Sequence, residues 1–386
     1  METLKIAFYT DSFLPARDGV VTSIINTRRE LMKRGHEVYI FTSGDSRTRR
    51  LVNGSKNIFV IRGMKLPRYP QYKVAVLPFM TTASISEIDP DIIHTHTPFF
   101  MGTWGLAMAK INKIPIVSTF HTLFNDKRAL EMYAPMHTAK FAEKYSWRYV
   151  RFYYNKCNVA IAPSETIKQM LAKHGVRNIS VVPNGLDINR FNPHVDSHRL
   201  RKKLQMRKDE RIVLYLGRIS KEKRLETLLR AARLLKEQNV RFVFAGTGPA
   251  LDHYRSMAHR LRISDITDFV GFVEDRILPS YYKAADAFCI PSTFETQGIA
   301  AYEALACGTP VIAADSLALR EAVQRGRNGE LFKPNDFHSC ARKIDKVINT
   351  RGLYKETRKT AENYSVERTT DRLLEIYKRV IKEATV

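Results

Sequence analysis

The sequence predicts an α/β protein made of two doubly wound, Rossmann-like parallel-sheet domains in series. The chain has 386 residues, which suits two domains better than one. Its 44% hydrophobic and 26% charged residues are typical of an ordinary globular protein. Short runs rich in Val and Ile alternate with amphipathic stretches from end to end. This pattern is typical of βαβ units whose strands are buried on both faces.

The first domain is expected over residues 1–190. A buried strand is predicted at 4–10, a helix at 20–34 and the next strand at 38–42. Further strands are predicted at 58–61, 91–96, 114–120, 159–163 and 179–183. The polar, basic and proline-bearing stretch 187–211 then interrupts the alternation, which makes it the best linker candidate.

The second domain is expected over residues 191–365. Its strands are predicted at 212–217, 241–246, 268–272, 287–291, 310–313 and 329–332. A periodic helix follows at 366–383, and we expect residues 366–386 to pack back on the first domain. Doubly wound sheets bind ligands beyond the carboxyl ends of their strands, so a cleft between two facing domains is the expected active site.

Charge and cysteine content narrow the class of protein. The formal net charge is +24, spread over both halves, and favours a polyanionic partner: nucleic acid, an anionic membrane or phosphorylated substrates. The four cysteines are far apart, which argues against a disulfide framework or a zinc ribbon. The sequence shows neither a signal peptide nor a run suited to crossing a membrane. We therefore expect a cytoplasmic, non-spanning protein.

The familiar nucleotide-binding motifs are missing. No P-loop occurs, and no GxGxxG follows the first strand. In its place, residues 11–20 form a strand-to-helix loop with Gly19, which either lets the backbone approach a ligand or serves a tight turn. The amides at the start of the following helix could accept an anion. The loop 246–249 is ambiguous in the same way.

The most informative window is residues 291–312, which reads as strand end, glycine-containing loop and helix. Glu295 lies in the loop, and Glu303 follows two helical turns later. The amides of Gln297, Gly298 and Ile299 at the helix start would meet a phosphate. A carboxylate at Glu303 can accept hydrogen bonds from a ribose diol. The alternative, a solvated Glu303, fits its apolar neighbours less well.

Basic residues follow the first strand of the second domain. Arg218 and Lys223 stand where a strand opens into a helix, and together they could neutralise a departing nucleoside diphosphate. Alone, such a loop is more often a solvated face. His121 ends a strand at the edge where ligands bind, which favours a functional role. His94 and His96 end another strand, and we favour structural or cleft-lining roles for them.

These pieces together resemble the retaining glycosyltransferases of family 4, which have the GT-B fold. The resemblance covers nearly the whole chain, in order. It is carried by the motifs FYTDSFLPARDGVVTSI, PDIIHTH, TFHT, VPNGLD, GR…K at 217–223, FAGTGP and PSTFETQGIAAYEALACGTPV.

The resemblance implies a role for each candidate residue. Arg218 and Lys223 would bind the diphosphate of a sugar nucleotide, and Glu303 would bind its ribose. Glu295, with the amides of residues 296–299, would hold the donor sugar and the phosphates. His121 would lie over the donor sugar, and Gly19 would let its loop approach the diphosphate. Family members need no metal and no cofactor besides the nucleotide sugar. The sequence Asp-Pro-Asp at 89–91 resembles a metal-binding motif only superficially, since it lies at the entry end of a strand.

The form Glu-Thr-Gln-Gly at 295–298 is similar to the diacylglycerol glucosyltransferase branch of the family. The resemblance thus implies transfer of a hexose, glucose from UDP-glucose, to a lipid hydroxyl such as diacylglycerol or an ether-lipid analogue. The run Asn-Asp-Lys-Arg at 125–128 departs from that branch. UDP and GDP, and the identity of the hexose, remain open.

A basic and aromatic segment fits a lipid acceptor. Basic residues mixed with aromatics suit a helix lying at an anionic membrane, which would place the protein at the inner face of the cell membrane. Alternatively, the aromatics pack into the core of the first domain. The residues are Lys140, Lys144, Arg148 and Arg151, with Tyr133, Phe141, Tyr145, Trp147, Tyr149, Phe152, Tyr153 and Tyr154. A second basic stretch comprises Arg47, Arg49, Arg50, Lys56, Arg62, Lys65, Arg68 and Lys73.

Two rival functions remain. One is transfer to a soluble sugar, a sugar phosphate or a polysaccharide. The other is a nucleic-acid-binding protein, which would bind no sugar nucleotide and lose affinity steeply with salt. The second rival leaves Glu295 and Glu303 without a role, and no nucleic-acid-binding module is recognisable. We therefore expect a nucleotide sugar, a lipid or glycan acceptor and an anionic membrane as partners, and no nucleic acid.

Overall fold

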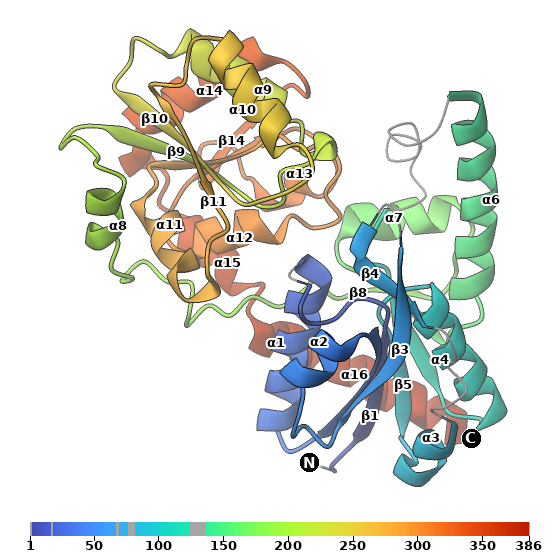
Figure 1. Ribbon diagram of the computed structural model, residues 1–386. Coiled ribbons are helices and arrows are strands. Elements are labelled where there is room, and N and C mark those ends of the chain that lie inside the picture. The colour runs from blue at the N-terminus through green and yellow to red at the C-terminus, as the bar shows by residue number, and fades with distance from the viewer. Residues whose placement is uncertain (1, 17, 67–68, 76–81, 124–135, 386) are drawn as a thin grey trace. The chain divides into compact units, whose positions relative to one another are not determined.

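The computed structural model divides the chain into two units (Figure 1). Unit 1 comprises Met1–Gly185 and Val366–Val386, and unit 2 comprises Leu186–Ser365. The structure describes residues 2–16, 18–66, 69–75, 82–123 and 136–385. The chain therefore crosses between the units at residues 185–186 and 365–366, so the second crossing coincides with the predicted start of the last helix.

Unit 1 is built on a sheet with the order β4-β3-β2-β1-β5-β6-β7-β8 among the described residues. All pairs are parallel except β3 with β4, which is antiparallel and was not predicted. The order reverses at β1 and β5, where the carboxyl ends of two neighbouring strands lead into different loops. The strands are β1 Lys5–Thr10, β2 Glu37–Gly44, β3 Ile58–Leu66, β4 Tyr69–Ala75, β5 Ile92–Thr95, β6 Ile116–Thr119, β7 Val159–Ala162 and β8 Ile179–Val181.

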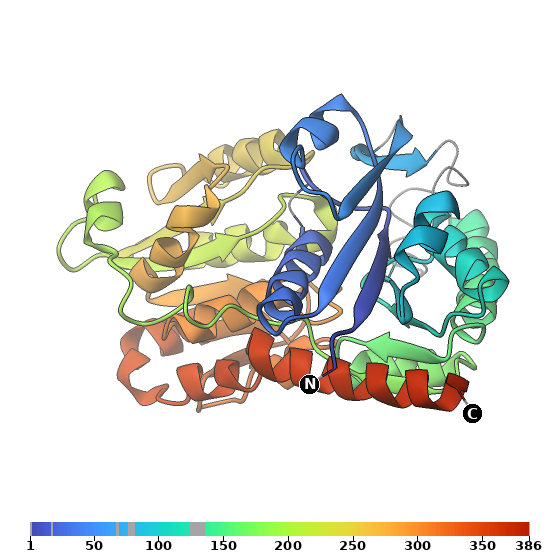
Figure 2. The same ribbon diagram turned by 90° about the horizontal axis from the view of Figure 1, so that it is seen from below.

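Helices cover this sheet, and the last of them arrives from the far end of the chain. Helix α16 contacts α1 and buries Leu373, Leu374 and Tyr377 in the same core as β1 and β2 (Figures 1 and 2, red). The helices described in unit 1 are α1 Gly19–Lys33, α2 Ser46–Leu51, α3 Thr82–Ile88, α4 Phe100–Ile111, α6 Met136–Tyr154, α7 Glu165–Lys173 and α16 Val366–Thr385.

Unit 2 is built on a fully parallel sheet with the order β11-β10-β9-β12-β13-β14. Its switch point lies between β9 and β12. The strands are β9 Arg211–Leu216, β10 Val240–Ala245, β11 Thr267–Gly271, β12 Ala287–Ile290, β13 Val311–Ala314 and β14 Gly329–Phe332. The helices are α8 His198–Lys203, α9 Leu225–Leu234, α10 Leu251–Arg260, α11 Leu278–Ala284, α12 Ile299–Ala306, α13 Leu319–Ala322, α14 Phe337–Asn349 and α15 Thr357–Glu362.

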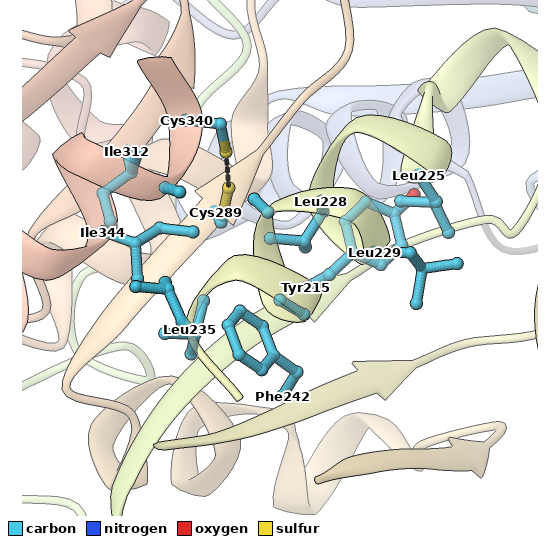
Figure 3. Packing of buried hydrophobic residues seen from close by; sticks show 14 of the residues in the cluster. Tyr215, Leu225, Leu228, Leu229, Leu235, Phe242, Cys289, Ile312, Cys340 and Ile344 are labelled. Atoms are coloured by element: carbon cyan, nitrogen blue, oxygen red, sulfur yellow. Dashed lines mark hydrogen bonds between the residues drawn. The ribbon is translucent and has the colours of Figure 1, made fainter. Parts of the chain in front are cut away.

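Both faces of the unit 2 sheet are packed. Leucines of α9 and Ile344 of α14 pack with Phe242 and Ile312 of the strands (Figure 3). In the same cluster, the sulfur atoms of Cys289 and Cys340 lie 4.0 Å apart, and both are free thiols. The prediction of two Rossmann-like, doubly wound domains is thus confirmed. It succeeded because strands buried on both faces carry the continuous apolar runs that the sequence displays.

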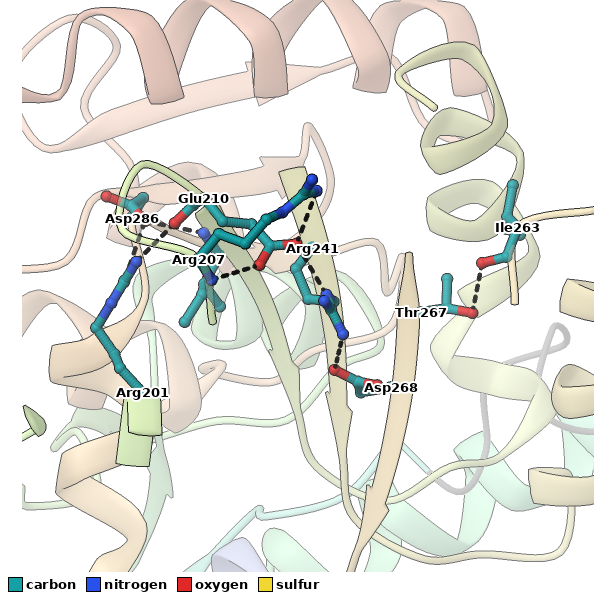
Figure 4. Close-up of polar contacts among 9 residues, drawn as sticks. Arg201, Arg207, Glu210, Arg241, Ile263, Thr267, Asp268 and Asp286 are labelled. Atoms are coloured by element: carbon teal, nitrogen blue, oxygen red, sulfur yellow. Dashed lines mark hydrogen bonds and ion pairs between the residues drawn. The ribbon is translucent and has the colours of Figure 1, made fainter. Parts of the chain in front are cut away.

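Ion pairs hold the amino ends of the unit 2 strands (Figure 4). Glu210 and Asp286 are buried, and Arg241 bonds to both Glu210, at 3.0 Å, and Asp268, at 3.2 Å. Burial would raise the pKa of Glu210, but hydrogen bonds from Arg207 and Arg241 outweigh it and lower that pKa. The carboxylates at this edge are therefore neutralised by structural partners, and the candidate ligand-binding groups lie at the other edge.

Candidate active site

Two loops at the carboxyl edge of unit 2 pack backbone against backbone. A Cβ added to Gly246 would lie 1.9 Å from the carbonyl oxygen of Gly217, and one added to Gly248 would lie 2.2 Å from that of Ile219. The Gly217 amide also donates to the Ala245 carbonyl at 3.0 Å. The glycines after β9 and β10 are therefore required by close approach, and the two loops form one rigid support.

This support carries the two predicted phosphate-binding cations. The hydroxyl of buried Tyr215 donates to the Arg218 carbonyl at 2.8 Å and fixes the loop. Lys223 ends a short 3₁₀ turn, and Arg224 takes a left-handed conformation with φ +55° before α9 begins. Both cations thus stand at the carboxyl end of β9, where an anionic ligand of a doubly wound sheet would bind.

The structure brings Lys223 and Glu295 together. The Lys223 ammonium donates to the Glu295 carboxylate at 2.6 Å. Their side chains are 25% and 14% exposed, so the pair faces solvent at its edge. A diphosphate could therefore reach Lys223 and compete with Glu295 for it.

Helix α12 begins without a side-chain cap. Gly298 is its N-cap with φ +77°, and a Cβ there would meet Leu319 at 2.7 Å. A glycine cap offers no side-chain acceptor, and the first amides of a helix lack the usual partner four residues earlier. The Ala301 amide donates to the Gly298 carbonyl at 2.8 Å, so the amides offered to a ligand are those at the very start of the helix. Gln297 is buried beside this turn. The geometry suits the predicted contact with phosphate oxygens.

Glu303 is buried, not solvated. Its side chain is 7% exposed, and its carboxylate accepts a hydrogen bond of 2.7 Å from Tyr282 of α11. Burial raises the pKa of Glu303 to about 7, although the Tyr282 bond and the charge of Arg190 act to lower it. Such a group gains from hydrogen-bond donors that stabilise its charged form, and a ribose diol supplies two.

Gly19 and His121 belong to unit 1. Gly19 is the exposed first residue of α1. The Asp18 carboxylate already accepts from the amides of Val20 and Val21, both at 3.0 Å. An anion at this helix start would have to displace Asp18, which limits the expected anion binding there.

Three histidines gather at the carboxyl ends of β5 and β6. The rings of His94 and His96 stack at 4.2 Å, and His96 Nδ1 lies 3.1 Å from His121 Nε2. Burial lowers the pKa of His94 to about 3 and that of His121 to about 4. All three imidazoles are therefore neutral near pH 7. Neutral imidazoles here act as hydrogen-bonding groups, not as cations.

Asp11, which follows β1, was not singled out by sequence reasoning. Its carboxylate accepts from the Met101 amide at 2.9 Å and from the Thr97 hydroxyl at 2.5 Å. Burial raises its pKa to about 6. Asp11 thereby ties the start of α4 to the switch point of unit 1. Tyr282 was also missed, because its contact with Glu303 joins two helices and leaves no local signal.

Helix α6 resolves the aromatic segment into two faces. Trp147, Tyr153 and Tyr154 are buried in unit 1, as the core-packing interpretation expects. Phe141, Tyr145 and Phe152 are 60–67% exposed. Core packing is therefore confirmed for these three buried aromatics, and the interpretation of the exposed ones as a membrane-facing surface stays a prediction. Tyr133 and residues 124–128 lie outside the described residues, as do the side chains of Lys65, Arg68, Lys73 and Lys140.

No described helix combines the length and apolarity needed to cross a bilayer. No group of three or more His, Cys, Asp or Glu side chains in the described part of the chain is arranged to hold a metal ion.

The two parallel-sheet, Rossmann-like units define the GT-B fold. Sucrose-phosphate synthase from Thermosynechococcus elongatus superposes with a TM-score of 0.83 over 98% of this chain and 100% of that chain, at 21% identity. At that identity the likeness establishes the fold alone.

The chain belongs to glycosyltransferase family 4. The protein-family model for Glycosyltransferase Family 4 matches residues 17–190, and the family model for Glycosyl transferases group 1 matches residues 196–364. The alpha-monoglucosyldiacylglycerol synthase of Streptococcus pneumoniae is 34% identical over 85% of this chain and 75% of that protein. The protein of the same name from Acholeplasma laidlawii is 30% identical over 86% of each chain. A GDP-mannose-dependent alpha-mannosyltransferase of Corynebacterium glutamicum is 27% identical over 86% of this chain and 78% of that protein.

Proposed function

We propose that the protein transfers glucose from UDP-glucose to the hydroxyl of a membrane lipid, diacylglycerol or an ether-lipid analogue, at the inner face of the cell membrane. Retention of configuration and independence from metal are part of the proposal. The similarity to two proteins named alpha-monoglucosyldiacylglycerol synthase supports a lipid acceptor. The observation that carries the proposal is the outer face of α6, defined here as Phe141, Tyr145, Arg148 and Phe152 with the flanking cations Lys144 and Arg151.

The outer face of α6 has the composition of an interfacial helix. Phe141, Tyr145, Arg148 and Phe152 follow one another at spacings of three or four residues and so form one stripe, while the opposite face fills the core. Arg148 lies 5.9 Å from the centre of the Tyr145 ring. Each cation near an anionic bilayer contributes about 1 kcal/mol to binding, so a handful is enough for reversible docking. Large aromatics that gather in water on one helix mark an interaction surface.

Helix α6 is joined to the segment after β5, where further aromatics are exposed. Tyr149 donates to the Pro98 carbonyl and lies 3.1 Å from the Thr103 hydroxyl, which joins α6 to α4. Phe99 and Phe100 follow directly and are 40% and 55% exposed. Acyl chains could therefore rest on this surface while the lipid hydroxyl lies near the ligand-binding edge of the unit 1 sheet.

The donor would be held by unit 2. Lys223 and Arg218 would neutralise the diphosphate, the α12 amides would bind its oxygens, and Glu303 would accept from the ribose hydroxyls. Glu295 would hold the sugar, with His121 as the unit 1 residue that the resemblance assigns to the reaction. The C1–phosphate bond breaks as the acceptor oxygen bonds C1 on the same face. The acceptor proton passes to the leaving phosphate oxygen, so no metal or separate base enters the balance.

Labelled UDP-glucose with anionic liposomes containing diacylglycerol tests the proposal. We expect label in the lipid phase, and more of it than with GDP-mannose. The variant Phe141→Ser/Phe152→Ser should lose liposome sedimentation and lipid labelling while keeping UDP-glucose binding. Phe272→Ser, which changes a phenylalanine that is 57% exposed in unit 2, is the matched control. Label found only on soluble sugars, sugar phosphates or glycans would favour the soluble-acceptor alternative.

A further inference from the structure

The last helix of the chain reaches the histidine cluster of unit 1. The Tyr377 hydroxyl of α16 lies 2.6 Å from His94 Nδ1, and the Thr119 hydroxyl lies 2.7 Å from His94 Nε2. Tyr377 and His94 are both buried. A neutral imidazole donates from one nitrogen and accepts at the other, so these two hydroxyls satisfy His94 completely and fix the plane of its ring.

The fixed ring of His94 restricts the next two histidines. His96 stacks on His94 at 4.2 Å with 28° between the planes, and Phe8 packs edge-on against His96 at 4.7 Å. The His96 ring therefore has little room to rotate. Its Nδ1 bonds to His121 Nε2, and the two rings are inclined by only 18°. Asn184 adds a side-chain hydrogen bond to His121.

We propose that Tyr377 is a positioning residue that sets the ring orientation of His121 through His94 and His96. The inference rests on the proposed role of His121 in the transfer reaction. Tyr377 touches no reacting atom in this account, and its effect is transmitted by one hydrogen bond, one ring stack and a second hydrogen bond.

An unsatisfied atom in the cluster supports a functional origin. His96 Nε2 is buried and has no hydrogen-bond partner among the described residues. A buried polar atom left without a partner is usually costly, so a cluster selected for stability alone would use apolar residues here. The arrangement holds three imidazole rings roughly parallel at the carboxyl edge of the sheet. It lowers stability but fixes the orientation of the rings.

Tyr377→Phe in the full-length protein is the main test, and Thr119→Val removes the other hydroxyl bond of His94 if the first variant does not fold. Tyr39→Phe is the matched control, because it deletes a tyrosine hydroxyl of the same unit that bonds to Glu37 at 2.5 Å. Selective ¹⁵N-histidine labelling reports the hydrogen bonding of the His121 ring nitrogens, assigned through His121→Gln. Turnover of UDP-glucose, to lipid or to water, gives kcat and KM.

We expect Tyr377→Phe to shift the ring-nitrogen resonances of His121 and to lower kcat roughly tenfold or more at unchanged KM for the donor. Tyr39→Phe should change neither. Unchanged His121 resonances in a folded variant would overturn the inference, as would shifted resonances with full kcat. Full turnover by His121→Gln would overturn it as well. None of these results depends on whether the glucose goes to a lipid, so failure of the proposed acceptor is seen separately.

Discussion

Replacement of Glu303 by glutamine should change how the stability of unit 2 depends on pH. The folded-state pKa of Glu303 is raised from 4.5 to about 7 by burial, so the folded protein binds a proton that the unfolded chain releases. Between these two pKa values the folded state holds more protons, and stability falls as pH rises. One pKa unit corresponds to about 1.4 kcal/mol, so the shift amounts to about 3 kcal/mol lost on going from pH 4.5 to pH 8.

Urea unfolding of the wild type and of Glu303→Gln at several pH values measures this loss. The difference in unfolding free energy between the two proteins isolates Glu303, because the other titrating groups are shared. Glutamine can still accept a hydrogen bond from Tyr282. The unfolding free energy of the variant minus that of the wild type should therefore be about 2–3 kcal/mol larger at pH 8 than at pH 5. A difference that stays constant from pH 5 to pH 8 would refute the reasoning, since it would mean that Glu303 ionises in the fold as easily as in water.

Three further predictions concern unit 2. Binding of UDP-glucose near pH 6.5 should release a fraction of a proton, because ribose hydroxyls favour the charged form of Glu303. Calorimetry in buffers of different ionisation enthalpy measures this proton release, and Glu303→Gln should abolish it. Lys223→Met should lower kcat/KM about 10²-fold or more with little loss of stability. Lys236→Met changes a lysine of similar side-chain exposure, 27% against 25%, that pairs with Asp265, and it should leave the kinetics unchanged. Equal effects of the two variants in steady-state assays would count against the site. Gly246→Ala should lower the stability measured by thermal unfolding by several kcal/mol, because the added Cβ meets the Gly217 carbonyl. Gly326→Ala, at a glycine with open space around it, should lower it by only about 1 kcal/mol. Similar melting points for the two variants would contradict the backbone contact.

The sequence was sufficient for the strands of both sheets except β4, and for placing the candidate residues at the carboxyl edges of the sheets. Strands such as β9 and β12 are buried on both faces, and their apolar runs are unambiguous. Strand β4, with the sequence YPQYKVA, was missed because a polar edge strand containing proline has no such run. The local motifs also placed Lys223 and Glu295 at one edge, where the structure pairs them.

The contacts that tune the candidate site could not be predicted. Tyr282 and Glu303 meet because α11 packs on α12, and Tyr377 meets His94 although the two residues are 283 positions apart in the sequence. Neither pairing has a spacing that periodicity can detect. Helix α6 shows the same limit in another form: its period predicts two faces, but only packing decides which aromatics are buried.

The second crossing of the chain has a consequence for synthesis. The core of unit 1 includes Leu373, Leu374, Tyr377 and Val380, so this unit lacks part of its interior until residues of α16 have left the ribosome. Unit 2 is one continuous segment that is translated earlier and can fold first. A nascent or truncated chain without α16 would thus contain a folded unit 2 and an incomplete unit 1. Assembly of the histidine cluster would be the closing event of folding, and an active enzyme would appear only after it.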